Sequence, residues 1–412
     1  MLNKIKQLGR DKFVRASGIL FTATTIFNIL NYLFQLLMGR MLGPADYGIF
    51  ATLFSIVYLV SAPLSAIQTA ITNFFARFKA EKAFGKIKNL FIRASKKIFL
   101  VSAVLTGVFL IFSRQIADFL NITSTIPIIV FGFFFLVTFV LSVSRGALQG
   151  LQKFKALGAN IILESSLKLI LSVTLVLAGF GLLGALWSVN IALFIVFFIT
   201  IFSLRKIFSY ESERVDRKEI YAKSLPILVA IIMLTAVYTL DVILVKHFFN
   251  PIAAGHYAAA SLLAKIIFFA SSSVSLVMFP KVAELHALKN NASDLLKKTL
   301  AFVAFLSIAG VTFYFLFSNF VVNFVFGAEY MSITPLIGLF GLAMGLFSIA
   351  FVLVNYYLAL GRTKFIYVLL PICALEFVLI WIFHNSLEQV IWTVLGTVVL
   401  ILAGLLAMYK AK

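Results

Sequence analysis

Apolar residues come along the chain in long runs that short polar breaks separate. A helix of about 20 residues crosses a hydrocarbon core of about 30 Å, so each run predicts one membrane-spanning helix. The pattern predicts twelve spans, near residues 17–39, 48–74, 98–114, 126–144, 157–179, 181–203, 225–245, 256–279, 299–317, 334–358, 365–383 and 387–409. The expected fold is therefore an all-α, polytopic membrane protein.

Polar side chains recur at helical spacing inside several of these spans, which places them on one face of the helix. The stripes are Thr24, Asn28, Asn31 and Gln35; Ser61, Ser65, Gln68 and Thr72; Thr138, Ser142, Arg145 and Gln149; Asn160, Glu164, Lys168 and Ser172; and Ser261, Lys265, Ser272 and Ser275. Polar groups are costly in lipid, so the stripes are expected to face the bundle or a wet cavity. A single hydroxyl there is more typical of helix packing than of binding.

Five charged residues fall at membrane depth, where a Lys costs about 2.5 to 3.5 kcal/mol. Lys168 lies one turn from Glu164, so it is either a binding group or half of a structural ion pair. Lys265 has no acid near it in the sequence and is the stronger candidate for function. Glu164, Asp241 and Glu376 are candidates for binding a coupling H⁺ or Na⁺. Asp241 is also expected to pair with another helix or to reach the interface.

Composition and charge support a membrane location. The chain is 62% hydrophobic and 12% charged, with a formal net charge of +20; an average soluble domain is about 25% charged. Nearly all of the 35 Lys and Arg residues fall in alternate loops and at the two ends, and the exceptions are Arg40, Arg114, Lys168, Lys246 and Lys265. This asymmetry predicts a multi-pass protein of the cell membrane with both termini in the cytoplasm. The basic charge is then an orientation signal, and no nucleic-acid partner is expected.

The remaining sequence features argue against secreted, metal-binding and enzymatic classes. The basic start MLNKIKQLGRDKFVR precedes an apolar run too long for a cleaved signal peptide. A single Cys373 rules out an intrachain disulfide, and no Cys/His cluster suggests a metal, so no cofactor is expected. The longest outside loop, SNFVVNFVFGAEYMSITP, offers only Glu329 as an ionisable catalyst. We therefore expect no enzymatic activity.

An internal repeat lies at half the chain length. PADYGIFA, from Pro44, matches PIAAGHYAA, from Pro251, at an offset of 207 in the 412 residues; both share the pattern P-x-x-x-G-x-[FY]-A. Both copies fall in the same outside loop of a six-span set. An even number of spans per half predicts parallel repeats, with an N-terminal lobe at 1–205, a cytoplasmic linker at 206–222 and a C-terminal lobe at 223–412.

The repeated motif has the residues of a tight connection. Pro and Gly break the helix, and the aromatic residue, Phe50 or Tyr257, is expected to anchor the next span at the membrane interface. The second copy has His247 and Ala253 where the first has Arg40 and Asp46. Arg40 and Asp46 are therefore not expected to be symmetric ligands.

Three segments carry a family resemblance. They are GRMLGPADYGIFA at 39–51, RGALQGLQKFKALGAN at 145–160 and DVILVKHFFNPIAAGHYAAAS at 241–261. They resemble polysaccharide-biosynthesis flippases of the Wzx/RfbX type, in the multidrug, oligosaccharidyl-lipid and polysaccharide exporter superfamily. The resemblance implies two six-helix lobes around a central cavity, working by alternating access. It also implies an isoprenoid-pyrophosphate-linked oligosaccharide as substrate, with membrane lipids and other polysaccharide-assembly proteins as partners.

The polar residues suit such a substrate, because pyrophosphate needs cations and sugars need hydroxyl and amide partners. The residues expected to attract pyrophosphate are Lys265, Lys168, Arg77 and Arg145, of which the two arginines are equally typical of positive-inside residues. Those expected to contact sugars are Asn28, Asn31, Gln35, Gln68, Thr72 and Asn73. No Walker motif is present. The membrane potential, worth about 2.3 kcal/mol per charge per 100 mV, can drive export instead.

Two other transporter classes share part of this pattern. A multidrug antiporter of the same superfamily is the main alternative, and it would favour cavity acids over the lysines and amides seen here. A major-facilitator transporter also has twelve spans in parallel halves. Its usual inner-loop pattern G-x-x-x-D-R is absent from RFKAEKAFGKIKNLFIRASKK.

Overall fold

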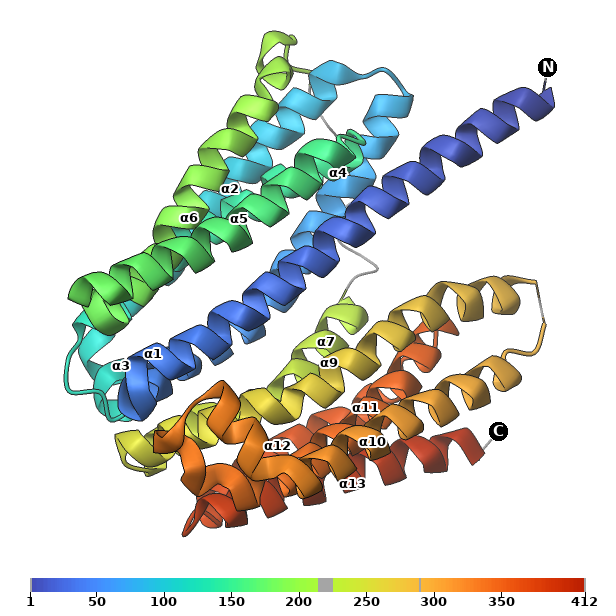
Figure 1. Cartoon of the computed structure of the whole chain (residues 1–412). Helices are drawn as coiled ribbons and strands as arrows, with labels where there is room; N and C mark the ends of the chain where they lie inside the picture. The colour runs from blue at the N-terminus through green and yellow to red at the C-terminus, as the bar shows by residue number, and fades with distance from the viewer. Residues whose placement is uncertain (1, 214–224, 289, 411–412) are drawn as a thin grey trace. The chain divides into compact units, whose positions relative to one another are not determined.

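The computed structural model describes residues 2–213, 225–288 and 290–410 (Figure 1). All the regular secondary structure of these residues is helical. By its internal contacts the chain divides into two compact units, Met1–Leu42 with Pro63–Ala222 and Gly43–Ala62 with Lys223–Lys412. The all-α prediction is confirmed. Residues 214–222 of the expected linker lie outside the described residues, and the lobe boundaries stay a prediction.

The first unit contains the helices up to residue 209. The exception is the middle part of α1, Gly43–Ala62, which belongs to the second unit. The bounds of these helices are α1 Leu2–Ala80, α2 Phe84–Ile111, α3 Ser113–Phe119, α4 Ile126–Gly150, α5 Phe154–Leu175, the π-helix η1 Val176–Phe180, α6 Gly181–Ser203 and the 3₁₀ helix η2 Arg205–Ser209. Helices α2, α4, α6 and α5 pack in that order, each on the next. Helices α4 and α6 are therefore the two inner helices of this series.

The second unit is built around α11. Its helices are α7 Leu225–Val237, α8 Leu240–Phe248, α9 Pro251–Ala287, α10 Ser293–Val325, the 3₁₀ helix η3 Ala328–Ile333, α11 Thr334–Ala359, α12 Ile366–Ile382 and α13 Leu387–Lys410. Helix α11 packs against α9, α10 and α13, and its Phe340 and Phe347 are fully buried. Glycines allow this closeness: a methyl group on Gly345 would lie 3.1 Å from Ser307 Cβ of α10.

Eight helices in the described part of the chain are long and apolar enough to cross a membrane, and the bent pair α7 and α8 makes a ninth. Two of the eight are long enough for two predicted spans each. The first breaks at Gly43, which has a φ of 71°, and the second joins α5 to α6 through Gly179, which has a φ of 91°. Glycine adopts such positive φ angles without steric cost. The number twelve itself stays a prediction.

The predicted span 225–245 is not one continuous helix, because the structure breaks it into α7 and α8 with a bend of 44°. Thr235 donates to the carbonyl of Ile231, and Thr239 donates to the carbonyl of Thr235. Such bonds from a side chain to the carbonyl one turn earlier compete with the helical ladder and bend helices. Broken helices in transporters line ligand sites, so the break directs attention to Asp241, in the first turn of α8.

A pair of glycines, Gly146 and Gly150, lets α4 approach the last third of α1 closely. A methyl group on Gly146 would lie 2.7 Å from the carbonyl oxygen of Gln68, and one on Gly150 would lie 2.6 Å from that of Thr72. Small residues four apart are a common device for packing membrane helices. This packing fixes α4, and with it Arg145, one residue before the first glycine.

The two copies of the repeated motif meet each other inside the second unit. A methyl group on Gly255 would clash with the carbonyl of Pro44, and one on Gly48 would lie 3.2 Å from the carbonyl of Pro251. These contacts are equivalent, because Pro44 corresponds to Pro251 and Gly48 to Gly255. The expectation that Phe50 and Tyr257 anchor the interface is wrong, since both are fully buried. Backbones this close draw the following aromatic side chains into the core.

We expect Gly255→Ala to destabilise the protein by about 1 to 3 kcal/mol, because overpacking forces backbones apart. The control is Gly396→Ala in α13, where an added methyl group meets no atom of the described residues within 4 Å. Thermal unfolding of the purified protein in detergent should show a lower Tm for the first variant and an equal or higher Tm for the second. Equal stability of the two variants would contradict the contact.

Candidate functional site

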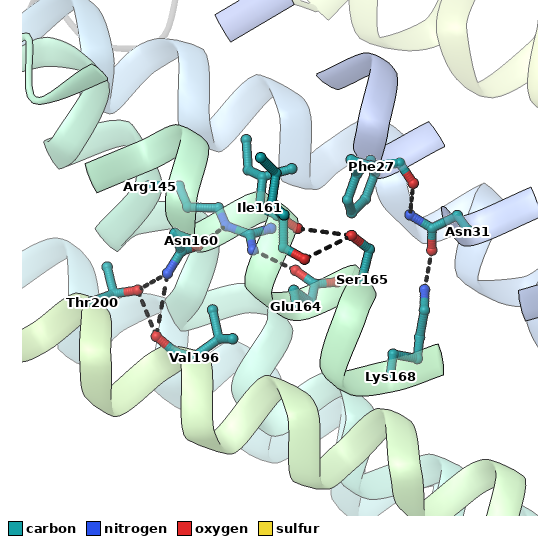
Figure 2. A network of polar contacts seen from close by, with 11 residues as sticks. Phe27, Asn31, Arg145, Asn160, Ile161, Glu164, Ser165, Lys168, Val196 and Thr200 are labelled. Carbon is teal, nitrogen blue, oxygen red and sulfur yellow. Dashed lines mark hydrogen bonds and ion pairs between the residues drawn. The ribbon is translucent and has the colours of Figure 1, made fainter. Parts of the chain in front are cut away.

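A cationic cluster lies inside the first unit, where Lys168 of α5 reaches α1. Its Nζ donates to Oδ1 of Asn31 (Figure 2). The same Nζ lies 4.8 Å from the centre of the Phe34 ring. Asn31 is turned toward Lys168 by its own Nδ2, which donates to the Phe27 carbonyl at 2.8 Å. Lys168 is 6% exposed. An amide and an aromatic face therefore stabilise the buried ammonium group without neutralising it.

The second cation of this cluster, Arg145, comes from α4. Its Nε donates to Oδ1 of Asn160 at 2.8 Å, and its Nη2 donates to Oε2 of Glu164 (Figure 2). Asn160 Nδ2 in turn donates to Thr200 Oγ1 and to the carbonyl of Val196 on α6. One continuous chain of polar contacts thus joins α4, α5 and α6.

The cluster carries more positive than negative charge. Arg145 and Lys168 face a single acid, Glu164, and all three interact electrostatically. The side chains of Arg145 and Glu164 are only 16% and 12% exposed, so water screens them poorly. A formal charge of +1 is left inside this helical unit. Such a group attracts an anion.

The other predicted residues of this unit differ in their contacts and in their burial. Gln68 and Thr72 hold α1 to α4: Gln68 donates to Gln149 Oε1 at 3.1 Å, and Thr72 donates to the carbonyls of Gln68 and Gly146. Gln35 is buried, whereas Asn28 and Asn73 are exposed. Arg77 forms an exposed pair with Glu81 one turn on, at 3.0 Å. The structure thus brings Lys168, Arg145, Asn31 and Glu164 together, and leaves Arg77 outside that cluster.

A second cluster, of opposite sign, lies inside the second unit around Asp241. Tyr257 of α9 donates to Asp241 Oδ2 at 2.8 Å, and both residues are fully buried. Asp241 lies in the first turn of α8, where the helix dipole and free backbone N–H groups favour a carboxylate. Lys265 interacts with it electrostatically and lies 5.6 Å from the centre of the Tyr238 ring.

Glu376 of α12 completes this second cluster. It is fully buried, interacts electrostatically with Asp241, and neither of its carboxylate oxygens has a partner among the described residues. With Lys265 the three groups have a formal charge of −1. A buried carboxylate without a partner is costly. The arrangement can therefore bind a cation or a proton, although no group of three or more His, Cys, Asp or Glu in the described chain forms a metal site.

Sequence reasoning missed the partners of these charges. Lys265 has its acid 24 positions earlier, on another helix, and Glu164 bonds to Arg145 rather than to the Lys168 of its own stripe. Tyr257 and Thr200 were not singled out as polar partners. The only available signal was a hydroxyl group inside an apolar span.

Residues 37–335 of the chain match the family described as "Polysaccharide biosynthesis protein". No curated protein matches the chain. Among solved structures, the chain is similar to an inward-facing multidrug resistance transporter of the MATE family in the MOP superfamily. The TM-score is 0.77 and the identity 13%, over 93% of this chain and 94% of that one.

Two further solved structures have a similar fold. Lipid II flippase MurJ, in an inward closed conformation, aligns with a TM-score of 0.74 and 16% identity, over 95% of this chain and 87% of that one. A MOP-superfamily transporter from Pyrococcus furiosus aligns with a TM-score of 0.59 and 14% identity, over 97% and 95%. The family match extends over most of the chain and these neighbours are transporters. The chain therefore belongs to the polysaccharide biosynthesis protein family, and it has the fold of these membrane transporters.

Proposed function

We propose that the protein flips an isoprenoid-pyrophosphate-linked oligosaccharide from the inner to the outer leaflet of the cell membrane by alternating access. The observation that carries this proposal is the Arg145–Glu164–Lys168 cluster, which keeps one net positive charge in an apolar bundle. Pyrophosphate is the part of such a substrate that is hardest to bring into a membrane. Buried cations that are only partly neutralised offset that cost.

We infer the orientation of the protein from the charge distribution of the loops. The loops rich in Lys and Arg are placed in the cytoplasm, together with both termini. Arg145, near the end of α4 that leads into one of these loops, then lies toward the side where the substrate is made. Lys168 lies deeper along α5. The two cations form successive contacts for the pyrophosphate, and Asn28, Asn73 and Gln35 remain proposed sugar contacts.

The Asp241 cluster supplies a means of coupling transport to an ion. A proton or Na⁺ bound between Asp241 and Glu376 removes the negative charge that offsets Lys265. Lys265 then becomes a stronger anion contact. By linkage, a bound anion also raises the affinity of the cluster for the cation.

The alternative is a multidrug antiporter for organic cations, and the buried Asp241 and Glu376 are the observation that favours it. The structural similarity to a MATE transporter fits this function equally well. The Arg145–Glu164–Lys168 cluster favours the flippase over the antiporter, because a site with net positive charge repels an organic cation. Organic cations that bind the purified protein, with no binding of a pyrophosphate lipid, would favour the antiporter.

We expect Lys168→Gln to lower flipping of a fluorescent lipid-linked oligosaccharide about 10- to 100-fold, because a charge-assisted hydrogen bond is worth about 1.5 to 3 kcal/mol. The assay uses reconstituted liposomes. The control is Lys155→Gln, an exposed position in the first turn of the same helix. Its flipping rate should stay near that of the wild type. Full activity of Lys168→Gln would remove Lys168 from the substrate path.

We expect Glu376→Gln to abolish the stimulation of flipping by an imposed Na⁺ or pH gradient, because the amide keeps the shape of the side chain but has neither its negative charge nor a site for the coupling proton. Flipping without a gradient should persist at a reduced rate. The matched control is Glu388→Gln, an exposed position near the start of α13. Equal stimulation of Glu376→Gln and the wild type by both gradients would place coupling elsewhere.

A further inference from the structure

We propose that Glu164 competes with the transported anion for Arg145. Its carboxylate accepts a hydrogen bond from the Arg145 guanidinium, and an incoming pyrophosphate displaces the carboxylate from that bond. This inference rests on the proposed function and deepens it. It assigns Glu164 a role that differs from binding a coupling ion. The residue sets how tightly the headgroup is held, and therefore how readily the headgroup is released.

The first observation is that the hydrogen-bonding capacity of Arg145 is only partly used. A guanidinium has five N–H donors in a flat fork. Arg145 donates through Nε to Asn160 and through Nη2 to Glu164, and the remaining three N–H groups have no partner among the described residues. A phosphate oxygen pair fits the free edge in the same bidentate manner as a carboxylate.

The second observation is that the same acid also acts on the second cation. Glu164 precedes Lys168 by one helical turn and interacts with it electrostatically. Lys168 donates to a single described acceptor, Asn31 Oδ1, so two of its three N–H groups are unused. When Glu164 leaves Arg145, both cations gain attraction for an anion together. The acid therefore weakens two anion contacts at once.

The burial of the cluster explains why a competitor is useful. Arg145 and Glu164 are 16% and 12% exposed, so two cations without an acid would bind a diphosphate strongly in this poorly screened site. A transporter must also release its substrate, and binding that is too tight slows turnover. An anion that must displace a carboxylate loses part of its binding free energy in the exchange, so it is held less tightly than two unpaired cations would hold it.

An ion pair that only stabilises the fold makes the opposite prediction. Removing one partner of a buried pair leaves an uncompensated charge and destabilises the protein. Under that reading Glu164→Gln disturbs Arg145 and weakens or does not change anion binding. The direction of the change in affinity therefore separates the two interpretations.

The test measures binding of farnesyl pyrophosphate to the full-length protein in detergent, with farnesol as the probe that lacks the anionic group. Glu164→Gln should bind farnesyl pyrophosphate about tenfold tighter than the wild type. Asn160→Asp keeps the acceptor for Arg145 and adds a carboxylate to the cluster, so it should bind about tenfold more weakly. Asn31→Asp adds a carboxylate beside Lys168 and should also weaken binding. It replaces Asn160→Asp in the test if that variant does not fold. Farnesol binding should be the same in every variant.

Flipping in liposomes supplies the second measurement. Glu164→Gln should lower both KM and kcat for the lipid-linked substrate, because tighter capture slows release. Equal or weaker farnesyl pyrophosphate binding by Glu164→Gln, with flipping by the wild type intact, would overturn the role of Glu164 alone. A wild type that neither binds the pyrophosphate nor flips the substrate would overturn the proposed function and this inference with it.

Discussion

The hydrogen bond and ion pair that connect Arg145 to Glu164 are the interactions on which the rest of the proposed site depends. In an apolar bundle water cannot satisfy a charge, so each buried ion must find partners on neighbouring helices. Arg145 finds Glu164 and Asn160 on α5, and Asn160 continues to Thr200 on α6. The same contacts that lower the cost of burial thereby hold three helices in register. Binding chemistry and packing are not separable here.

The two units solve the burial problem with opposite charge. The first combines two cations with one acid, and the second combines two acids, Asp241 and Glu376, with one cation, Lys265. The repeat in the sequence therefore does not extend to the charges. One unit thus carries an anion-attracting cluster and the other a cation-attracting cluster, which fits the proposed coupling of an anion to a cation.

Hydrophobic runs predicted the helical membrane fold, because a span is a local property of about 20 consecutive residues. Helical spacing also placed Asn160, Glu164 and Lys168 on related positions of α5. Periodicity predicts the direction in which a side chain points from its own helix, but it does not predict which other helix that side chain contacts. Hence the bond from Arg145 to Glu164 and the proximity of Lys265 to Asp241 could not be predicted. The break at Thr239 was missed because it depends on side-chain bonds to the backbone rather than on hydropathy.

The reciprocal contacts of Gly48 and Gly255 bear on the history of the chain. Pro44 meets Gly255 and Pro251 meets Gly48, so each copy of the motif presents the same surface to the other. This reciprocity defines an isologous interface, the kind formed by two identical subunits about a two-fold axis. A half-length ancestor that paired with itself through this motif would leave the same contacts after gene fusion. Each glycine is then constrained by its counterpart, and the two positions are expected to have stayed small together while the charges of the two halves diverged.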